Sequence, residues 1–553
     1  MTNSLKIALA QVNQAMGDVA SNARAMLAIR AEAASRGADL VVYPEMALLG
    51  YPPEDLVLRP AVVEACARAA AELISATGDG GPGMIITTPW QDNGKLYNAG
   101  LVADGGKLIA ARYKYDLPNY GVFDEKRVFN AGPLPGPVPF RGIRLGLMIC
   151  EDMWKPEVSE CLAETGAEIL IVPNGSPFEL GKGDTRLMLA VARVVETKLP
   201  LIYLNRVGGQ DELVFDGASF VLNADCTVPW RQPDFLEHLA ITEWRRQGEQ
   251  WVCAPGEMAT PLEPLPAVYS AMMVGLRDYV DRNRFPGVVL GLSGGIDSAI
   301  SATVAVDALG PDRVRCVMLP SRYTSQLSLD DAAACAKALG CPYETVPIEP
   351  AVAAFTGMLA PSFAGRNSDI TEENLQSRIR GVVLMAQSNK FGHMVLTTGN
   401  KSEMSVGYAT LYGDMCGGYS VLKDVYKTMV FDLSRWRNRA KPVDAKGPEG
   451  IVIPESIIQR PPTAELRENQ TDQDSLPPYD QLDAILEMLV EKEMSVREII
   501  AAGQPEDVVR RVQHLLYIAE YKRRQAPPGV KITSRNFGRD RRYPITNGWR
   551  ERT

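Results

Sequence analysis

The sequence predicts an α/β protein made of two domains. Its 553 residues exceed what one hydrophobic core usually organises, so two or more domains are expected. Short apolar runs alternate with alanine-rich helical stretches, which favours mainly parallel sheets covered by helices. A proline-rich segment without periodicity, residues 253–269, interrupts this alternation and is interpreted as a linker. The expected domains are therefore residues 1–252 and 270–553.

Buried strands and helices are expected in the following order. The first domain has six apolar runs with the length of strands, at residues 5–12, 38–45, 83–89, 144–151, 167–174 and 199–205. It has helical patterns at residues 21–36 and 60–76. In the second domain, strands are expected at residues 288–293, 314–321, 343–349 and 393–400, with helices at 328–339 and 372–388.

Composition and charge argue against several classes of protein. With 46% hydrophobic and 23% charged residues the chain is typical of globular proteins, and its net charge of -9 disfavours general binding to nucleic acid. No apolar run reaches the roughly 18 residues of a membrane helix, and the N-terminus lacks a secretory pattern. The nine cysteines are scattered without a CxxC pair, which disfavours a zinc ribbon or a disulfide framework. We therefore expect a cytoplasmic protein without nucleic-acid or membrane partners.

The segment GVVLGLSGGIDSAI, residues 287–300, has the layout of a phosphate-binding loop. Glycines after a strand let backbone N–H groups converge on an anion, and the helix that follows adds partial positive charge. A Walker loop would add a lysine, whereas Asp297 stands at the helix start here. This carboxylate is favourable beside phosphates if it holds Mg²⁺, and the hydroxyls of Ser293 and Ser298 can bond phosphate oxygens. The alternative is a simple glycine turn capped by Asp and Ser.

Three expected strand ends carry residues suited to amide hydrolysis. Cys150 offers a thiolate nucleophile, Glu45 a proton shuttle and Lys114 an ammonium for the oxyanion. The charge of Lys114 is also expected to lower the pKa of Cys150. The chain has three histidines, the one closest in sequence to Cys150 being His238, so this set is more economical than a Cys/His pair. Taken singly, the three residues are typical of a buried core cysteine, a cap and a surface lysine.

These motifs resemble known families. SGGIDS is similar to the pyrophosphate loop of the ATP pyrophosphatases, which cleave ATP between its α- and β-phosphates. Glu45, Lys114 and Cys150, in this order, resemble the nitrilase superfamily over most of residues 4–250. Together with TEENLQSRIRG, TTGNKSE, GYATLYGDMCGGYSVLKDVYKT, PPTAELRENQTDQDSLPPYDQLD and EYKRRQAPPGVKIT, they make nearly the whole chain resemble the glutamine-dependent NAD synthetase family. The resemblance implies an N-terminal nitrilase-like α-β-β-α sandwich and a C-terminal Rossmann-like, parallel-sheet ATP pyrophosphatase domain.

The resemblance also implies roles for individual residues. The glutamine amide would be hydrolysed by Glu45, Lys114, Cys150 and Glu125, the last orienting the lysine. Glutamine would be bound by Tyr120, Ser176 and Lys182. ATP would contact Gly291, Leu292, Ser293, Gly294, Gly295, Ile296, Asp297, Ser298, Thr398, Lys427 and Thr463. The deamido dinucleotide would contact Asn374, Arg378, Glu403, Asp414 and Lys522, and Mg²⁺ would be held by Asp297 and Glu403. Taken singly, Asn374, Thr398 and Asp414 are more typical of caps and turns than of a binding site. The C-terminal tail, residues 521–553, is strongly basic, and most of it is typical of a solvated segment.

The implied activity is the ATP-dependent amidation of deamido-NAD with ammonia from glutamine, by a homo-oligomer with an internal route for the ammonia. One alternative is an amidotransferase that makes GMP or asparagine, which would pair the loop with a different glutaminase and lack EENLQSR. A tRNA-thiolating enzyme would need paired cysteines and a basic face. A non-catalytic nucleotide sensor would be expected to lack one or more of Glu45, Lys114, Cys150 and Asp297, and all are present.

Overall fold

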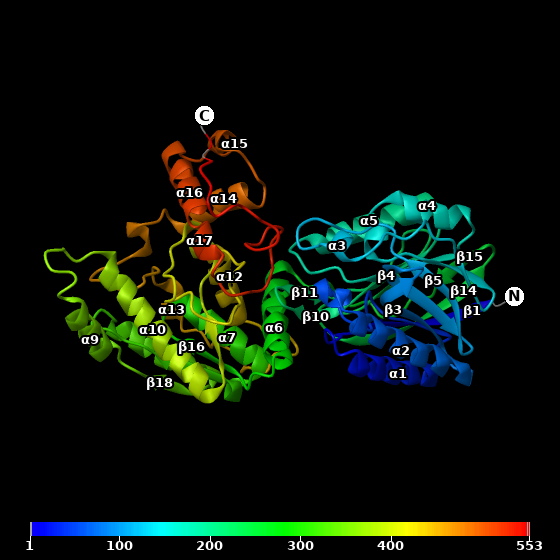
Figure 1. Cartoon of the computed structure of the whole chain (residues 1–553), viewed down its shortest axis with the longest axis horizontal. Coiled ribbons are helices and arrows are strands. Elements are labelled where there is room, and N and C mark those ends of the chain that lie inside the picture. The colour runs from blue at the N-terminus through cyan, green and yellow to red at the C-terminus, as the bar shows by residue number, and fades with distance from the viewer. Residues whose placement is uncertain (1–2, 550, 552–553) are drawn as a thin grey trace. The chain divides into compact units, whose positions relative to one another are not determined.

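The chain folds into two compact units that divide between Leu262 and Glu263. The computed structural model describes residues 3–549 and 551, and Figure 1 shows the arrangement of elements within each unit. The expected linker, residues 253–269, is shorter than predicted: Cys253 ends strand β15 (Gln250–Cys253) and helix α6 (Pro264–Arg282) begins at Pro264. Proline suits the first position of a helix, so one proline of this segment marks a helix start.

Two sheets form the centre of the first unit. The seven-stranded sheet has the order β15-β14-β1-β2-β3-β4-β5. Its other strands are β1 (Ser4–Gln11), β2 (Leu40–Val42), β3 (Gly83–Asp92), β4 (Lys95–Asp104), β5 (Lys107–Tyr113) and β14 (His238–Gln247). The six-stranded sheet has the order β13-β12-β9-β8-β7-β6. Its strands are β6 (Val138–Phe140), β7 (Ile143–Leu147), β8 (Ile169–Asn174), β9 (Leu201–Asn205), β12 (Phe220–Leu222) and β13 (Trp230–Arg231), and a separate hairpin joins β10 (Val207–Gln210) to β11 (Leu213–Asp216).

The expectation of mainly parallel sheets is wrong for this unit. Only β1-β2-β3 and β7-β8-β9 pair in parallel, and the flanking strands are antiparallel. Two-residue turns, Asn93-Gly94 and Gly105-Gly106, connect β3 to β4 and β4 to β5, with positive φ at all four residues. Asn-Gly and Gly-Gly are the residues that tight hairpins require. These pairs were the sequence signal for the antiparallel strands.

Helices cover the outer face of each sheet and complete an α-β-β-α sandwich, as expected. Helices α1 (Val19–Ser35) and α2 (Pro60–Ala76) pack on the seven-stranded sheet. Helices α4 (Pro156–Glu164) and α5 (Lys182–Thr197) pack on the six-stranded sheet. Between the sheets, aliphatic side chains of both inner faces form a third core cluster with Trp244 and Trp251. The short helix α3 (Glu125–Val128) lies outside these layers.

A five-stranded, wholly parallel sheet forms the centre of the second unit, which confirms the prediction there. Its order is β18-β17-β16-β19-β20. The strands are β16 (Val288–Gly291), β17 (Val314–Met318), β18 (Tyr343–Thr345), β19 (Met394–Thr397) and β20 (Tyr419–Ser420). Helix α10 (Ile370–Phe391) packs on the sheet through one apolar cluster. Helix α7 (Ile296–Leu309) contacts β16, β17, α6 and α12 (Lys427–Arg437), and is buried along almost its whole length.

Smaller helices complete this unit. They are α8 (Gln326–Leu339), α9 (Glu349–Leu359), α11 (Lys401–Val406), α13 (Glu455–Gln459), α14 (Tyr479–Val490), α15 (Val496–Ala501), α16 (Glu506–Ile518) and α17 (Glu520–Arg523). Residues of α11, α14, α15 and α16 share an apolar cluster of their own. Helix α10 is longer than predicted because Asp369 caps it, its side chain accepting a hydrogen bond from the Thr371 N–H while Glu372 bonds back to Asp369.

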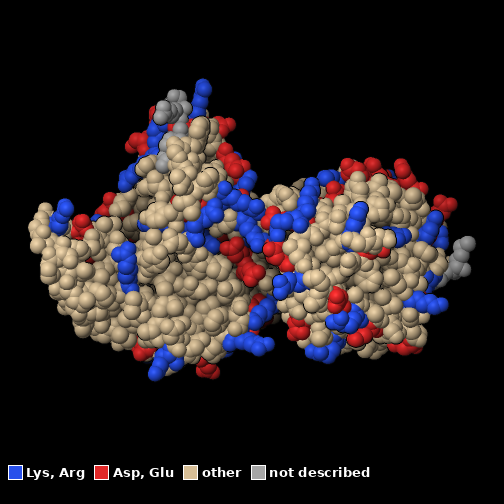
Figure 2. Space-filling model, viewed as in Figure 1, with Lys and Arg blue, Asp and Glu red and all other residues tan. Residues whose placement is uncertain are grey.

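No helix among the described residues is long and apolar enough to cross a membrane. The visible face of each unit carries both acidic and basic side chains (Figure 2).

A buried charge network joins α6, α7 and α12. The guanidinium of Arg437 donates two hydrogen bonds to Asp307, at 2.6 and 2.9 Å, and the Tyr269 hydroxyl donates a third at 2.5 Å. All three side chains are almost completely inaccessible to solvent. Burial, together with the charge of Asp307, raises the pKa of Tyr269 well above its usual range. The network therefore holds these three helices together, and it depends on the negative charge of Asp307.

We predict that Asp307→Asn destabilises the second unit by about 3–5 kcal/mol, because it leaves the Arg437 charge buried without a partner. The measurement is denaturant unfolding followed by circular dichroism. The control is Asp432→Asn, which removes an exposed pair with Arg435 on the same helix α12 and should cost less than about 1 kcal/mol. Equal stability of both variants would contradict a structural role for the buried network.

Candidate active sites

Cys150 stands on a strained turn directly after strand β7. Its φ of 49° lies in the left-handed region, which a side chain adopts at a cost and which is common at functional sites. Asp152 fixes the turn: one carboxylate oxygen accepts the Ile149 N–H at 2.9 Å, and the other accepts the N–H groups of Tyr115 and Asp116. The same carboxylate thus ties the Cys150 turn to the segment that follows Lys114.

The structure brings the predicted Glu45, Lys114 and Glu125 into direct contact. The Lys114 ammonium donates to Glu45 Oε1 and to Glu125 Oε1, each at 2.8 Å. Glu45 and Lys114 are wholly buried, and Glu125 and Cys150 are 5% and 4% exposed. Burial by itself would lower the pKa of Lys114, but the charges of Glu125 and Glu45 outweigh it and hold the pKa well above its usual range. Lys114 is therefore a cation that two carboxylates stabilise.

Further donors that the sequence did not indicate fix the two carboxylates. Asn98 Nδ2 donates to Glu45 Oε1 at 2.7 Å, and the Gly175 N–H donates to Glu45 Oε2 at 2.9 Å. The Tyr51 hydroxyl donates to Glu125 Oε1 at 2.8 Å. Asn98 lies in the middle of β4 and Tyr51 in a loop, so no local pattern pointed to either residue.

Lys114 lowers the pKa of Cys150 as expected, but burial has a larger and opposite effect. Burial, together with the negative charges of Glu45 and Glu151, raises the pKa of Cys150 well above its usual range. The positive charge of Lys114 acts in the expected direction but is outweighed. The thiol is therefore protonated at neutral pH, and a thiolate can form only by transfer of its proton to a neighbouring base.

The three residues expected to bind glutamine lie in two different environments. Tyr120 is exposed and donates to both oxygens of Glu151 at 3.0 Å. Lys182 Nζ lies 5.8 and 5.9 Å from the ring centres of Phe123 and Trp154, and its charge partly opposes the rise that burial causes in the Glu151 pKa. Ser176, in contrast, is buried, and its hydroxyl accepts a hydrogen bond from Arg186.

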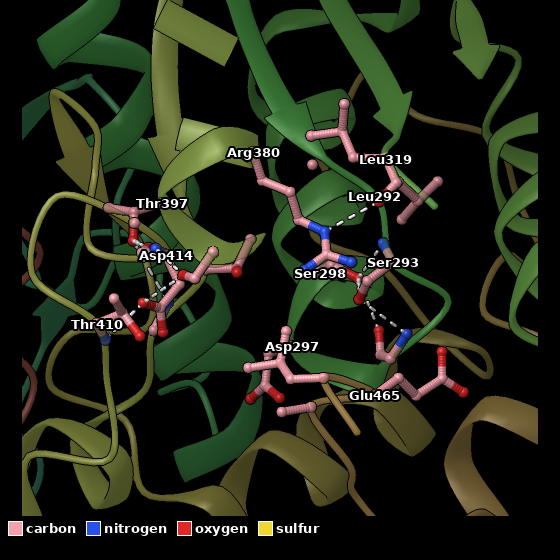
Figure 3. A pocket seen from close by; sticks show the side chains of 18 of the residues that line it. Leu292, Ser293, Asp297, Ser298, Leu319, Arg380, Thr397, Thr410, Asp414 and Glu465 are labelled. Carbon is pink, nitrogen blue, oxygen red and sulfur yellow. Dashed lines mark hydrogen bonds between the residues drawn. The ribbon is translucent and has the colours of Figure 1, made fainter. Parts of the chain in front are cut away.

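In the second unit, a cavity of about 280 Å³ opens at the end of β16 (Figure 3). Most of the residues expected to bind ATP line it. They are Gly291, Leu292, Ser293, Gly295, Ile296, Asp297, Ser298, Thr398, Lys427 and Thr463. Glu403 and Asp414 line the same cavity, and Gly294 belongs to the loop without lining it.

The glycine loop is held in shape by its own serines. Ser298 Oγ accepts from the Ser293 N–H at 3.2 Å and donates to the Gly295 carbonyl at 2.9 Å, and the Gly295 N–H donates to Ser293 Oγ. Gly294 has φ +79°, and a Cβ atom there would lie 2.3 Å from the Ser328 carbonyl oxygen. Glycine is therefore required at this position for two reasons, backbone conformation and space.

Lys427 bridges the two carboxylates that were expected to hold a metal. Its ammonium donates to Asp297 Oδ2 at 2.5 Å and to Glu403 Oε1 at 3.0 Å, and Asn400 donates to the other oxygen of Asp297. Burial raises the pKa of Glu403 to about 7, against the opposing charge of Lys427. Among the described residues, no group of three or more metal-ligating side chains occurs. Oxygen ligands of this type fit Mg²⁺ if phosphates and water complete its coordination.

Three of the residues expected to bind the dinucleotide do not line the cavity but hold the loop at 407–414. The Thr410 hydroxyl donates to Asn374 Oδ1, and Arg378 Nε donates to the Leu411 carbonyl. Lys522 Nζ donates to the carbonyls of Gly407 and Ala409, both at 2.7 Å. This loop carries Asp414, whose carboxylate accepts the Thr410 N–H.

The cavity also contains charged residues that sequence reasoning missed. Arg380 and Glu465 both line it (Figure 3). Arg380 lies in the motif SRIRG, two residues beyond Arg378, so a second arginine in the expected binding helix was the available signal.

The comparisons with known proteins agree with this two-site organisation. The first unit matches the carbon-nitrogen hydrolase family over residues 6–250, and the second matches the NAD synthase family over residues 268–526. The chain is 52% identical to the glutamine-dependent NAD(+) synthetase of Rhodobacter capsulatus, with 100% of both chains covered. It is 41% identical to that of Thermotoga maritima, with 99% of each covered.

Solved structures show the same architecture. The glutamine-dependent NAD+ synthetase of Acinetobacter baumannii, solved with ADP, is 43% identical with a TM-score of 0.79, and 100% of both chains is covered. That of Cytophaga hutchinsonii is 21% identical with a TM-score of 0.83, over 99% of this chain and 98% of the other, and shows likeness of fold. The chain therefore belongs to the glutamine-dependent NAD(+) synthetase family.

Proposed function

We propose that the chain amidates deamido-NAD to NAD, using ATP and ammonia released from glutamine, and forms AMP, pyrophosphate and glutamate. The observation that carries this proposal is the presence, in one chain, of a buried Glu-Lys-Cys set and a lysine-free phosphate loop beside two carboxylates. The full-length identity to glutamine-dependent NAD(+) synthetases supports it.

For glutamine hydrolysis we propose the following roles around Cys150. Glu45, held as a hydrogen-bond acceptor by Lys114, Asn98 and Gly175, takes the thiol proton as the sulfur attacks the amide carbon. Lys114 stabilises the negative charge that develops on the amide oxygen. Glu45 then gives its proton to the leaving nitrogen. Ammonia departs, and a thioester between Cys150 and the glutamyl group remains. Water, activated by the same carboxylate, releases glutamate and restores the thiol.

The side chains around the exposed Tyr120 suit the charged end of an amino acid. Glu151 and Lys182 offer opposite charges for the α-ammonium and α-carboxylate of glutamine, and the Tyr120 hydroxyl orients Glu151. Ser176 takes part by positioning, since its hydroxyl bonds to Arg186, which Asp216 holds in turn.

In the second unit, ATP activates the substrate carboxylate by adenylation, and ammonia displaces AMP. The loop 291–298 receives the departing pyrophosphate through its N–H groups and serine hydroxyls, with Thr398 and Thr463 as further ATP contacts. Asp297 and Glu403 would hold Mg²⁺, which supplies charge neutralisation at the phosphates when bound. Lys427, which bridges both carboxylates, would contact the phosphates from there. Asp414, Glu403, Asn374, Arg378 and Lys522 shape the dinucleotide site, the last three through the loop at 407–414.

We also propose a cytoplasmic homo-oligomer. The nine cysteines are free thiols, which suits a reducing compartment. The family relationship supports paired synthetase units and an internal path for ammonia.

The direct test is product analysis with ATP, deamido-NAD and either glutamine or ammonium salts. We expect NAD, AMP and pyrophosphate with both nitrogen sources, and an equal amount of glutamate with glutamine. Formation of ADP and phosphate instead of AMP and pyrophosphate would contradict the assignment of the loop. Amidation of a nucleobase or of aspartate would favour a different amidotransferase.

Cys150→Ala should abolish glutamine-driven synthesis and leave ammonium-driven synthesis near the wild-type rate, because the thiol takes part only in releasing ammonia. The measurement is NAD formation with each nitrogen source. Cys161→Ala, in the same unit but outside the site, should behave as the wild type with both. Equal loss of both activities in a folded Cys150→Ala protein would contradict the division of labour.

Asp297→Asn should lower synthesis about a hundredfold or more with either nitrogen source, because it weakens the charge that anchors the metal at the phosphates. Glutamine hydrolysis assayed alone should persist. The control is Asp312→Asn, which removes an exposed carboxylate from the same unit. Near-normal synthesis by Asp297→Asn would reduce this residue to a structural partner of Lys427 and Asn400.

A further inference from the structure

Arg380 places a guanidinium in the wall of the ATP cavity. It belongs to α10, and its Nε donates to the Leu319 carbonyl at 2.9 Å, just beyond the end of β17. Figure 3 shows this guanidinium lying between Leu319 and the hydroxyls of Ser293 and Ser298. The hydrogen bond through Nε therefore fixes the side chain beside the phosphate loop and leaves its two Nη groups to face the cavity.

The cavity has a shortage of positive charge for a ligand as anionic as ATP. The carboxylates that line it come from Asp297, Glu403, Asp414, Glu465 and Asp472. The cations among the described lining residues are Lys427 and Arg380. Lys427 already bridges Asp297 and Glu403. Arg380 is thus the cation of this cavity that is not held by a carboxylate, since none of the described residues forms an ion pair with it.

This situation differs from that of two fully buried arginines in the protein. Arg437 and Arg186 each form paired hydrogen bonds with one carboxylate, Asp307 and Asp216 respectively. Burial lowers the pKa of Arg380 to about 10, against the smaller opposing effects of the Glu465 and Asp414 charges, so the group stays charged at neutral pH but has lost hydration. An anion that enters the cavity would restore the missing interactions of this cation.

The chemistry of a guanidinium selects the anion. Its planar N–H groups match two oxygens of a phosphate and form short, charge-assisted hydrogen bonds. The loop 291–298 offers N–H groups and hydroxyls but no lysine. Resting on the proposed ATP site, we propose that Arg380 is a phosphate-binding residue, which supplies from α10 the cationic contact that the loop itself lacks.

The test compares how Arg380→Met, Arg380→Lys and a control bind four probes. The probes, titrated calorimetrically in magnesium buffer, are ATP, pyrophosphate, adenosine and deamido-NAD. Arg380→Met should weaken the binding of ATP and pyrophosphate about 10- to 100-fold, as expected for loss of charged hydrogen bonds. The affinities for adenosine and deamido-NAD should stay unchanged. Arg380→Lys should give an intermediate loss of affinity, because it keeps the positive charge but not the paired N–H groups of the guanidinium. Lys390→Met, which removes an exposed charge from the same helix, should match the wild type.

Other results would overturn the inference. If adenosine and ATP lost affinity equally, Arg380 would lie against the base. If only deamido-NAD lost affinity, Arg380 would belong to the site of that substrate. Wild-type ATP and pyrophosphate binding by folded Arg380→Met would show that the guanidinium contacts no phosphate. If Arg380→Met does not fold, as judged by thermal unfolding, Arg380→Lys decides by the same comparison. A wild-type protein that binds ATP but forms no NAD would contradict the proposed function while leaving the result for Arg380 intact.

Discussion

A buried lysine that bridges two carboxylates organises each of the two sites. Lys114 lies between Glu45 and Glu125 in the first unit, and Lys427 lies between Asp297 and Glu403 in the second. Removing three charges from water is costly, and it is tolerated only when their mutual geometry and additional hydrogen bonds compensate. The surrounding structure supplies these bonds in both cases, through Asn98 and Gly175 in one site and Asn400 in the other.

The lysine-carboxylate clusters of the two units lie in different chemical surroundings. In the first unit the thiol beside the cluster is protonated, because burial raises its pKa. The thiolate must then form during the attack, by transfer of the thiol proton to a neighbouring base, because the resting thiol is not ionised. In the second unit the cavity is acidic, so an anionic nucleotide requires added cations. In our proposals these cations are Mg²⁺ on Asp297 and Glu403 and the guanidinium of Arg380.

The fold places these groups by bringing chain segments together at the ends of strands. Glu45 and Cys150 follow strands β2 and β7, which belong to different sheets of the sandwich. The loop of residues 291–298 follows β16, the central strand of the parallel sheet. The loop at 407–414 is held by side chains from α10 and α17, which lie more than a hundred residues apart in sequence. Loops and turns at the ends of strands thus carry the reactive groups, and side chains from two helices fix the loop at 407–414.

The sequence by itself determined the two-domain organisation and the parallel sheet of the second unit. Through its resemblance to known families it also pointed to Glu45, Lys114, Asp297 and Glu403 as candidate site residues, but not to the bridging position of Lys427. Those features depend on local patterns and on motifs whose order along the chain is informative. Only the tertiary structure decided the antiparallel flanks of the first unit, the partners Asn98 and Tyr51, and the direction of the Cys150 pKa. The physical reason is that burial and long-range contact set these properties: a thiol, an amide or an arginine acquires its role from neighbours that no local pattern places beside it.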